Sequence, residues 1–181
     1  MTCSFLALTS DNVRAMPGPV RDERADALRA RYHAAFPDAE LPVPVQAIAE
    51  DLLGLRVGVS QDLAVSGMLL PPERQIWLNG GEVAARRRFT LAHELGHWVC
   101  QHLEGKAAPF YCRSKDVAPD TDQALEREAN VFAAELLMPE PAVRAVFSGS
   151  VEVTAEAFGV SEEAMHWRLF NVGLLETTPH R

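Results

Sequence analysis

The chain has 181 residues, of which 48% are hydrophobic and 23% charged, and its formal net charge is −8. This composition indicates a globular protein with a sizeable core and excludes wholesale disorder. The acidic balance argues against nucleic acid or an anionic membrane as the main partner, and no apolar run approaches the ~20 residues of a membrane-spanning helix. Three cysteines without paired spacing, together with a poor match to a signal peptide, predict a cytoplasmic protein.

The first half of the chain predicts two helices followed by a small sheet. Residues 1–20 show no periodicity and are expected to form a flexible lead-in. Apolar residues at helical spacing predict one helix from Arg21 to Phe36 and a second over roughly 44–53. Alternating hydrophobicity then predicts three short strands, over residues 55–59, 67–70 and 75–78. We expect these strands to form an antiparallel or mixed sheet beside the next helix.

The second half of the chain is predicted to be helical. The expected helices cover residues 82–102, about 122–138, 141–147, 154–158 and 162–170. The last two flank a short turn and form a helix-turn-helix pattern. From Ser150 onward two basic residues stand against five acidic ones, a balance that disfavours DNA reading. The prediction is an α+β fold with a main domain over 21–149 and a small helical segment over 150–181 packed against it.

The predicted helix 82–102 carries the sequence His93-Glu94-x-x-His97. Residues four apart on an α-helix lie about 40° apart in projection, so both imidazoles face the same way and can bind one metal ion. Glu94 is rotated away from that direction and remains able to act on a water molecule. The motif therefore predicts a catalytic zinc site and a hydrolase, most often a peptidase.

A catalytic zinc site needs a third protein ligand and keeps one position for water. A histidine soon after the motif or a glutamate on a later helix can supply it. His102 lies roughly 140° around the helix from His97 and points away. The later helix offers three glutamates. In a projection down the axis of this helix, Glu126 falls inside the apolar sector. Glu128 and Glu135 lie beyond the edge of that sector, towards solvent. A carboxylate on an apolar face needs a strong partner, so Glu126 is the first candidate and Glu128 the second.

Other polar residues have candidate roles around this site. Asn130 lies one turn after Glu126, where it either accepts a hydrogen bond from a ligating histidine or is a structural asparagine. Three residues are candidates for stabilising the developing oxyanion, with ordinary surface or core positions as the alternative: Tyr111, Arg113 and His166. Cys100 lies near the histidine face and is expected to be buried and inert.

The two motif-bearing segments together resemble the ImmA/IrrE family of metallopeptidases. The first is Arg88-Phe89-Thr90-Leu91-Ala92-His93-Glu94-Leu95-Gly96-His97, and the second is Glu126-x-x-Ala129-Asn130-x-Phe132-Ala133-x-x-Leu136-Leu137-Met138-Pro139. The likeness runs from about Val43 to Leu175. It implies a zincin-like core that holds one Zn²⁺, or another divalent metal such as Mn²⁺. The implied ligands are His93, His97 and Glu126, with Glu94 as the catalytic base.

The resemblance also implies a biological role. Members of the family cleave helix-turn-helix (XRE-type) transcriptional repressors, often encoded next door, and so switch on genes. The expected function is therefore a zinc metalloendopeptidase whose protein substrate is such a repressor, with no direct contact to nucleic acid or membrane. The alternative is a non-proteolytic regulatory module that titrates a protein partner and keeps a structural or vestigial metal site.

Overall fold

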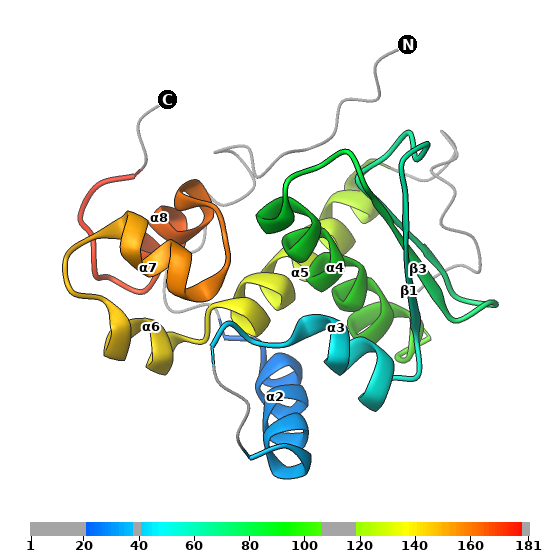
Figure 1. Cartoon of the computed structure of the whole chain (residues 1–181), viewed down its shortest axis with the longest axis horizontal. Coiled ribbons are helices and arrows are strands. Elements are labelled where there is room, and N and C mark those ends of the chain that lie inside the picture. Colours follow the sequence, from blue (N-terminus) through cyan, green and yellow to red (C-terminus); the bar gives the residue numbers. More distant parts are fainter. Residues whose placement is uncertain (1–20, 38–40, 106–118, 179–181) are drawn as a thin grey trace.

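The computed structural model describes residues 21–37, 41–105 and 119–178, and the side chains of the last range from residue 124. The predicted lead-in, residues 1–20, lies outside this part. The described helices are α2 (Glu23–Ala35), α3 (Val45–Ala47), α4 (Ala84–His97), α5 (Pro119–Leu137), α6 (Glu140–Val146), α7 (Val151–Phe158) and α8 (Glu162–Asn171). Figure 1 shows α4 and α5 crossing the middle of the molecule, with the sheet on one side and α6–α8 on the other. The fold is α+β, as predicted.

The sheet has three strands: β1 (Arg56–Ser60), β2 (Gly67–Leu70) and β3 (Gln75–Asn79). The strand order is β1-β3-β2, with β1 parallel to β3 and β2 antiparallel to β3, so the sheet is mixed. The turn between β2 and β3 closes at Arg74, which adopts a φ of 51°. Leu69, Ile76 and Leu78 are buried, and α4 packs against β2 and β3. The sheet therefore supports the helix that carries the histidine motif.

Strand β2 approaches α4 closely because residue 67 has no side chain. A Cβ atom at Gly67 would lie 2.4 Å from Cγ2 of Thr90 and 3.3 Å from Oε1 of Glu94. Any larger residue at this position would collide with the side chain of Thr90, which is buried. The main chain of β2 consequently forms one wall beside the Glu94 carboxylate.

Two π-helical segments continue the helices that precede them. Segment η1 (Ile48–Leu52) follows α3, and η2 (Trp98–His102) follows α4. In η2 the amide of Leu103 donates to the carbonyl of Trp98, 3.0 Å away, which is the i to i+5 pattern. The helix predicted over 82–102 thus begins at Ala84 and loosens directly after His97. Such π-turns are frequent at functional sites.

Helices α4 and α5 touch through their backbones at one point. A Cβ atom at Gly96 would lie 2.8 Å from both the Cα and the carbonyl oxygen of Ala129. Glycine on α4 and alanine on α5 therefore allow an approach that larger residues would prevent. Glu126 lies one turn before this contact, and His93 and His97 lie on either side of Gly96 along α4. The contact brings the two ligand-bearing surfaces together.

The last two helices are anchored to α5 by a buried ion pair. Arg168 of α8 donates through Nε to the carbonyl oxygen of Met138, 2.8 Å away, and through Nη2 to the Glu135 carboxylate. Only 1% of Glu135 and 5% of Arg168 is exposed. The prediction that Glu135 faces solvent is wrong, because α8 covers this side of α5 and supplies the cation that the carboxylate needs. Burying either charge alone would be very costly.

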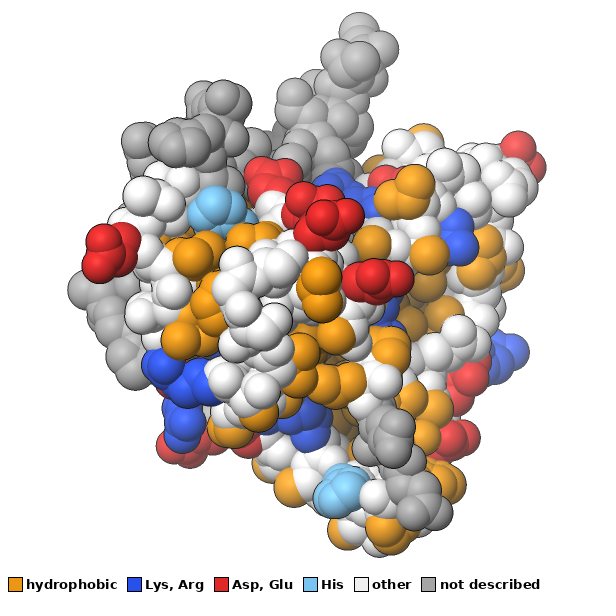
Figure 2. All heavy atoms as spheres, turned by 60° about the vertical axis from the view of Figure 1, so that its left-hand side comes forward, with side chains coloured by type: hydrophobic (Ala, Val, Ile, Leu, Met, Phe, Trp, Pro, Cys, Tyr) orange, Lys and Arg blue, Asp and Glu red, His pale blue; other side chains and the backbone are white. Residues whose placement is uncertain are grey.

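Helices α7 and α8 expose acidic side chains at their surface. Ser150 and Ser161 cap the two helices, and Gly159 ends α7 with a φ of 62°. Four glutamates on these helices are exposed: Glu152, Glu156, Glu162 and Glu163. Figure 2 brings the α6–α8 side forward and shows acidic side chains gathered on the upper part of that face. In the described part of the chain, no helix is both long and apolar enough to span a membrane.

Candidate metal centre

Three side chains from two helices converge on one point. His93 and His97 lie in the last turns of α4, and Glu126 faces them from α5. The two histidine Nε2 atoms are 3.0 Å apart, and Glu126 Oε2 and Oε1 lie 3.3 Å from His93 Nε2 and 3.4 Å from His97 Nε2. All three groups offer ligand atoms within 4.8 Å of one another. The structure thus brings together the two histidines and the glutamate that the apolar sector of its helix singled out.

The outer nitrogens of both imidazoles face amide oxygens. His93 Nδ1 lies 3.0 Å from Oδ1 of Asn130, and His97 Nδ1 lies 2.8 Å from Oε1 of Gln101. An amide oxygen only accepts hydrogen bonds, so each Nδ1 donates its proton and each neutral ring carries its lone pair on Nε2. Two such lone pairs at 3.0 Å repel each other unless a cation or a proton lies between them.

These donor atoms suit a divalent metal ion. Two imidazole nitrogens and a carboxylate are a common ligand set for catalytic zinc, with bonds of about 2.0–2.2 Å. The two Nε2 atoms lie 3.0 Å apart, and each lies 3.3–3.4 Å from one of the two Glu126 carboxylate oxygens. These distances are less than about twice that bond length, so one ion can contact all three side chains. His97 is buried, whereas His93 and Glu126 are partly exposed. The arrangement can therefore hold a metal ion that remains reachable from solvent.

The electrostatics of the centre favour added positive charge. Burial alone would lower the pKa of His97, but the hydrogen bond to Glu126 and the charges of Glu94 and Glu126 raise it to about 9. Burial alone would raise the pKa of Glu126, but its contacts with His93 and His97 hold it well below its usual range. A metal ion supplies the same compensating charge without a proton.

Glu94 lies beside the three converging groups without belonging to them. Its carboxylate oxygen faces the main chain of β2 at Gly67, and the side chain is partly exposed. It is close enough for its charge to raise the pKa of His97. A carboxylate that is near the metal ligands, partly open to water and outside the ligand set has the position that a general base requires.

The other candidates for the third ligand lie elsewhere. His102 stacks on the ring of Trp98 with 4.4 Å between centroids, and among the described side chains it is not part of the converging group. The carboxylate of Glu128 lies 3.0 Å from Nη1 of Arg24. Each therefore has a partner of its own on another side of its helix.

The remaining candidates fall into three groups. Cys100 is fully buried, and this burial raises the pKa of its thiol to about 12, which agrees with the expectation of an inert residue. His166 donates through Nε2 to the carbonyl of Thr177, 3.1 Å away. Tyr111 and Arg113 lie outside the described residues, and their suggested role remains a prediction.

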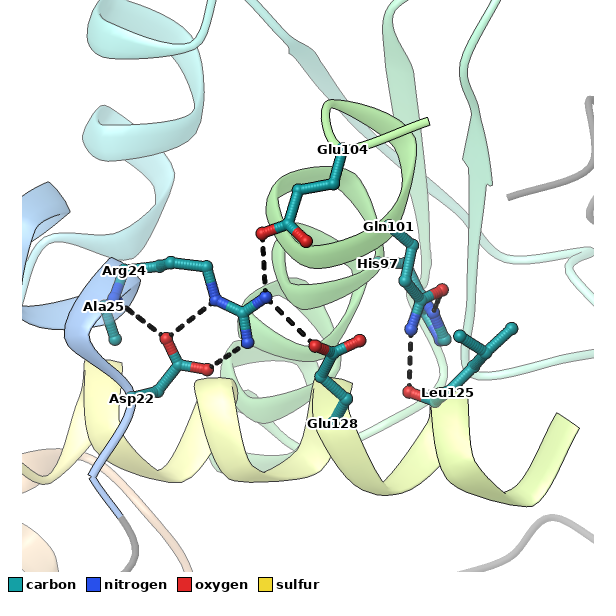
Figure 3. Close-up of polar contacts among 8 residues, drawn as sticks. All are labelled: Asp22, Arg24, Ala25, His97, Gln101, Glu104, Leu125 and Glu128. Carbon is teal, nitrogen blue, oxygen red and sulfur yellow. Dashed lines mark hydrogen bonds and ion pairs between the residues drawn. The ribbon is translucent and has the colours of Figure 1, made fainter. Parts of the chain in front are cut away.

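Gln101 is a site residue that the sequence reasoning missed. It lies in the π-helical segment η2 and is fully buried. Its Nε2 donates to the carbonyl oxygen of Leu125, 2.7 Å away, which orients the amide so that Oε1 faces His97 (Figure 3). One amide therefore fixes the ring of His97 and also holds the residue directly before Glu126. The spacing of four residues after His97 was a signal for this contact, because such residues share a helix face.

Comparisons with known proteins place the chain in a family. The model of the peptidase M78 family, described as the IrrE N-terminal-like domain, matches residues 53–170. This is more than half of the chain, and it includes His93, Glu94, His97 and Glu126. The chain belongs to this ImmA/IrrE family of metallopeptidases. The family prediction made from the two motif-bearing segments is confirmed.

Two individual proteins extend this result. The radiation response metalloprotease IrrE of Deinococcus radiodurans is 32% identical over 77 residues, which make up 42% of this chain and 23% of that protein. A Mycobacterium tuberculosis transcriptional regulator has a similar fold, with a TM-score of 0.62 and 16% identity. The match covers 88% of this chain and 48% of that regulator. The chain therefore spans less than a quarter of the length of IrrE and about half that of the regulator.

Proposed function

We propose that this chain is a zinc-dependent endopeptidase with a zincin-like core, whose metal is held by His93, His97 and Glu126. The observation that carries the proposal is the pair of imidazoles whose Nδ1 protons are engaged by amide oxygens, so that both Nε2 lone pairs converge beside a carboxylate. Without a metal ion this arrangement requires a shared proton, and with one it is a complete set of three protein ligands. Another divalent metal such as Mn²⁺ is the alternative cofactor.

Glu94 acts as the general base in this proposal. When bound, the zinc ion lowers the pKa of a water molecule to about 7 and polarises the carbonyl of the scissile peptide. Glu94 would take the proton of the water as the water oxygen bonds to the carbonyl carbon, and would pass that proton to the amine as the C–N bond breaks. Because water is the nucleophile, no covalent enzyme intermediate forms. Gln101 and Asn130 hold the histidine rings through Nδ1, which keeps both Nε2 atoms directed at the same point.

The proposed substrate is a helix-turn-helix transcriptional repressor of the XRE type. Family membership and the metalloprotease relative support a protein substrate. The exposed glutamates of α7 and α8 offer a surface suited to a protein partner with basic residues rather than to phosphates. In this proposal residues 21–149 form the peptidase domain and residues 150–181 a helix-turn-helix-like segment packed on it.

The test is cleavage of a purified helix-turn-helix repressor of the XRE type, chosen from the reading frames beside this gene where one of them encodes such a protein. Zinc-loaded protein should release new peptide fragments, detected by mass spectrometry, and chelator should stop their formation. Glu94→Gln should keep zinc binding but slow cleavage by about 100- to 10,000-fold, the usual contribution of a general base. Full activity in that variant would overturn the role of Glu94. A stable complex with the repressor and no fragments would favour the alternative function, a regulatory module that acts by binding.

A further inference from the structure

Helix α2 lies outside the residues that the family model matches, yet its first turn reaches the helices of the metal centre. Arg24 is the residue that makes this connection. Its Nη1 atom lies 3.0 Å from the carboxylate of Glu104 and 3.0 Å from that of Glu128 (Figure 3). Glu104 follows η2 by two residues, and Glu128 follows Glu126 by two residues on α5. One guanidinium therefore bridges three segments that are far apart in the sequence.

The guanidinium is held in place by the cap of its own helix. Nε and Nη2 of Arg24 form a two-pronged contact with the carboxylate of Asp22, at 3.1 and 2.7 Å. The same carboxylate caps α2 by accepting from the backbone amides of Arg24 and Ala25, at 2.9 and 3.4 Å, and Asp22 is buried. A two-pronged contact of this kind fixes the plane of the side chain. Nη1 is thus presented to Glu104 and Glu128 by a rigid support.

The Arg24 bridge and the Gln101 contact lie on either side of Glu126 along α5. Gln101 of η2 holds the carbonyl of Leu125, and Arg24 joins Glu128 to Glu104 at the end of the same helical segment. Removing Arg24 would leave the carboxylates of Glu104 and Glu128 facing each other without this cation between them. The start of α5 would lose this tie to η2, and the repulsion between two like charges would favour a shift of α5 that carries Glu126 away from the histidines.

We infer that Arg24 is a positioning residue for the metal centre, which holds Glu126 of α5 at the right distance from His93 and His97 of α4. The inference rests on the proposed function, because it assumes that these three residues bind the metal. It adds that a helix outside the family match contributes to metal affinity. The competing explanation is that Arg24 merely attaches α2 to the body of the protein.

Arg29 provides a matched control, because it also attaches α2 to α5. Its Nη1 donates to the carbonyl of Glu135, 2.6 Å away, and its Nη2 lies 3.9 Å from the Glu135 carboxylate. Glu135 follows Glu126 by nine residues, which is about 13 Å along a helix. Loss of Arg29 should therefore loosen α2 without moving the metal centre.

The experiment makes two measurements. Competition with a chromophoric chelator gives the zinc affinity, and the visible absorption spectrum of the Co²⁺-substituted protein reports the geometry of the ligands. Arg24→Gln should lower zinc affinity about 10-fold, the lower end of the range for residues that act behind the ligands, and should change the Co²⁺ spectrum. Arg29→Gln should lower the melting temperature but leave zinc affinity within about twofold, because its contact on Glu135 lies about 13 Å along α5 from Glu126. Arg24→Gln combined with Glu104→Gln should recover much of the lost affinity, because the repulsion is removed. Arg24→Lys keeps a cation and should bind zinc more tightly than Arg24→Gln.

The outcomes separate the inference from the proposed function. Equal affinities in the wild type and in Arg24→Gln, or equal losses in Arg24→Gln and Arg29→Gln, would overturn the positioning role while leaving the zinc site intact. A wild-type chain that binds no zinc would overturn the proposed function itself. If Arg24→Gln does not fold, Arg24→Lys takes its place: it lacks the two-pronged contact with Asp22, so it should still bind zinc more weakly than Arg29→Gln does. Equal zinc affinities in Arg24→Lys and Arg29→Gln would then overturn the positioning role.

Discussion

Helix α5 carries two inward-facing carboxylates whose surroundings differ in kind. Glu126 faces two imidazoles, which bear a positive charge only when a proton or metal ion is present. Glu135, nine residues later, faces the guanidinium of Arg168, which is always charged. The first carboxylate lies in an arrangement that remains open to a cation from solution. The second is already compensated by the protein itself.

The contrast shows how two acidic residues on one helix serve different ends. A buried carboxylate paired with arginine stabilises the packing of α8 on α5 and has no use for a metal. A carboxylate paired with histidines gains from a metal, because the ion replaces a proton that the rings otherwise need. The partner, rather than the glutamate, therefore separates a candidate functional site from a structural contact.

The largest expected effect follows from Glu126→Gln. Zinc sites with four protein ligands bind with about 10–16 kcal/mol, or roughly 2.5–4 kcal/mol per ligand, so zinc affinity should fall by about 100- to 1000-fold. Chelator competition on the purified variant measures this loss. Glu135→Gln is the control and should bind zinc as the wild type does. Equal zinc affinity in Glu126→Gln and in the wild type would remove the distinction between the two carboxylates.

The next effect concerns stability and falls on the other carboxylate. Glu135→Gln leaves Arg168 buried without its counter-charge, which should cost about 3–5 kcal/mol of unfolding free energy. Denaturant unfolding of the metal-free variants measures it. Replacing both residues by apolar ones, as in Glu135→Leu with Arg168→Met, should cost much less than the single change, because no uncompensated charge remains. A double variant no more stable than Glu135→Gln would show that the ion pair is not the source of the loss.

A smaller effect is expected at the amide that joins the two helices. Gln101→Met removes both the contact to His97 and the hydrogen bond to Leu125, and should lower zinc affinity about 10-fold, as is typical for residues behind metal ligands. Asn130→Leu should act similarly through His93. Isothermal titration with zinc against a competing chelator gives both values. Unchanged affinity in both variants would mean that the histidine rings need no support from these amides.

A separate effect is a pH dependence of the stability of the metal-free protein. The pKa of His97 is raised to about 9 in the folded state, above its ordinary value of about 6.5 in an unfolded chain. The folded form therefore keeps a proton that the unfolded form loses, so this stabilisation is complete below about pH 6.5 and disappears as the pH rises through 9. The melting temperature in chelator should fall over this window, and the fall should be weaker in Glu126→Gln. An equal fall in both proteins would assign it to other groups.

Much of the site was predictable because its residues follow helix geometry. His93 and His97 share a face by their spacing, and Glu126 was distinguished by its position in an apolar sector. The solvent exposure of Glu135 was predicted wrongly because a helical projection considers one helix alone. The burial of Glu135 depends on Arg168, 33 residues further along the chain. The bridge made by Arg24 was missed for the same reason. Likewise, the parallel pairing of β1 with β3 depends on a long-range alignment that alternation within a strand cannot reveal.

The backbone contact between Gly96 and Ala129 has a consequence for the choice of metal. No side chain larger than a methyl group separates α4 from α5 at this point, so the spacing between the histidines and the glutamate follows directly from the spacing of the helix axes. The distance between the axes of α4 and α5 thereby affects the radius of the ion that the three ligands can bind. Substitutions at Ala129 offer a way to retune the site for a smaller or larger ion while every ligand stays unchanged.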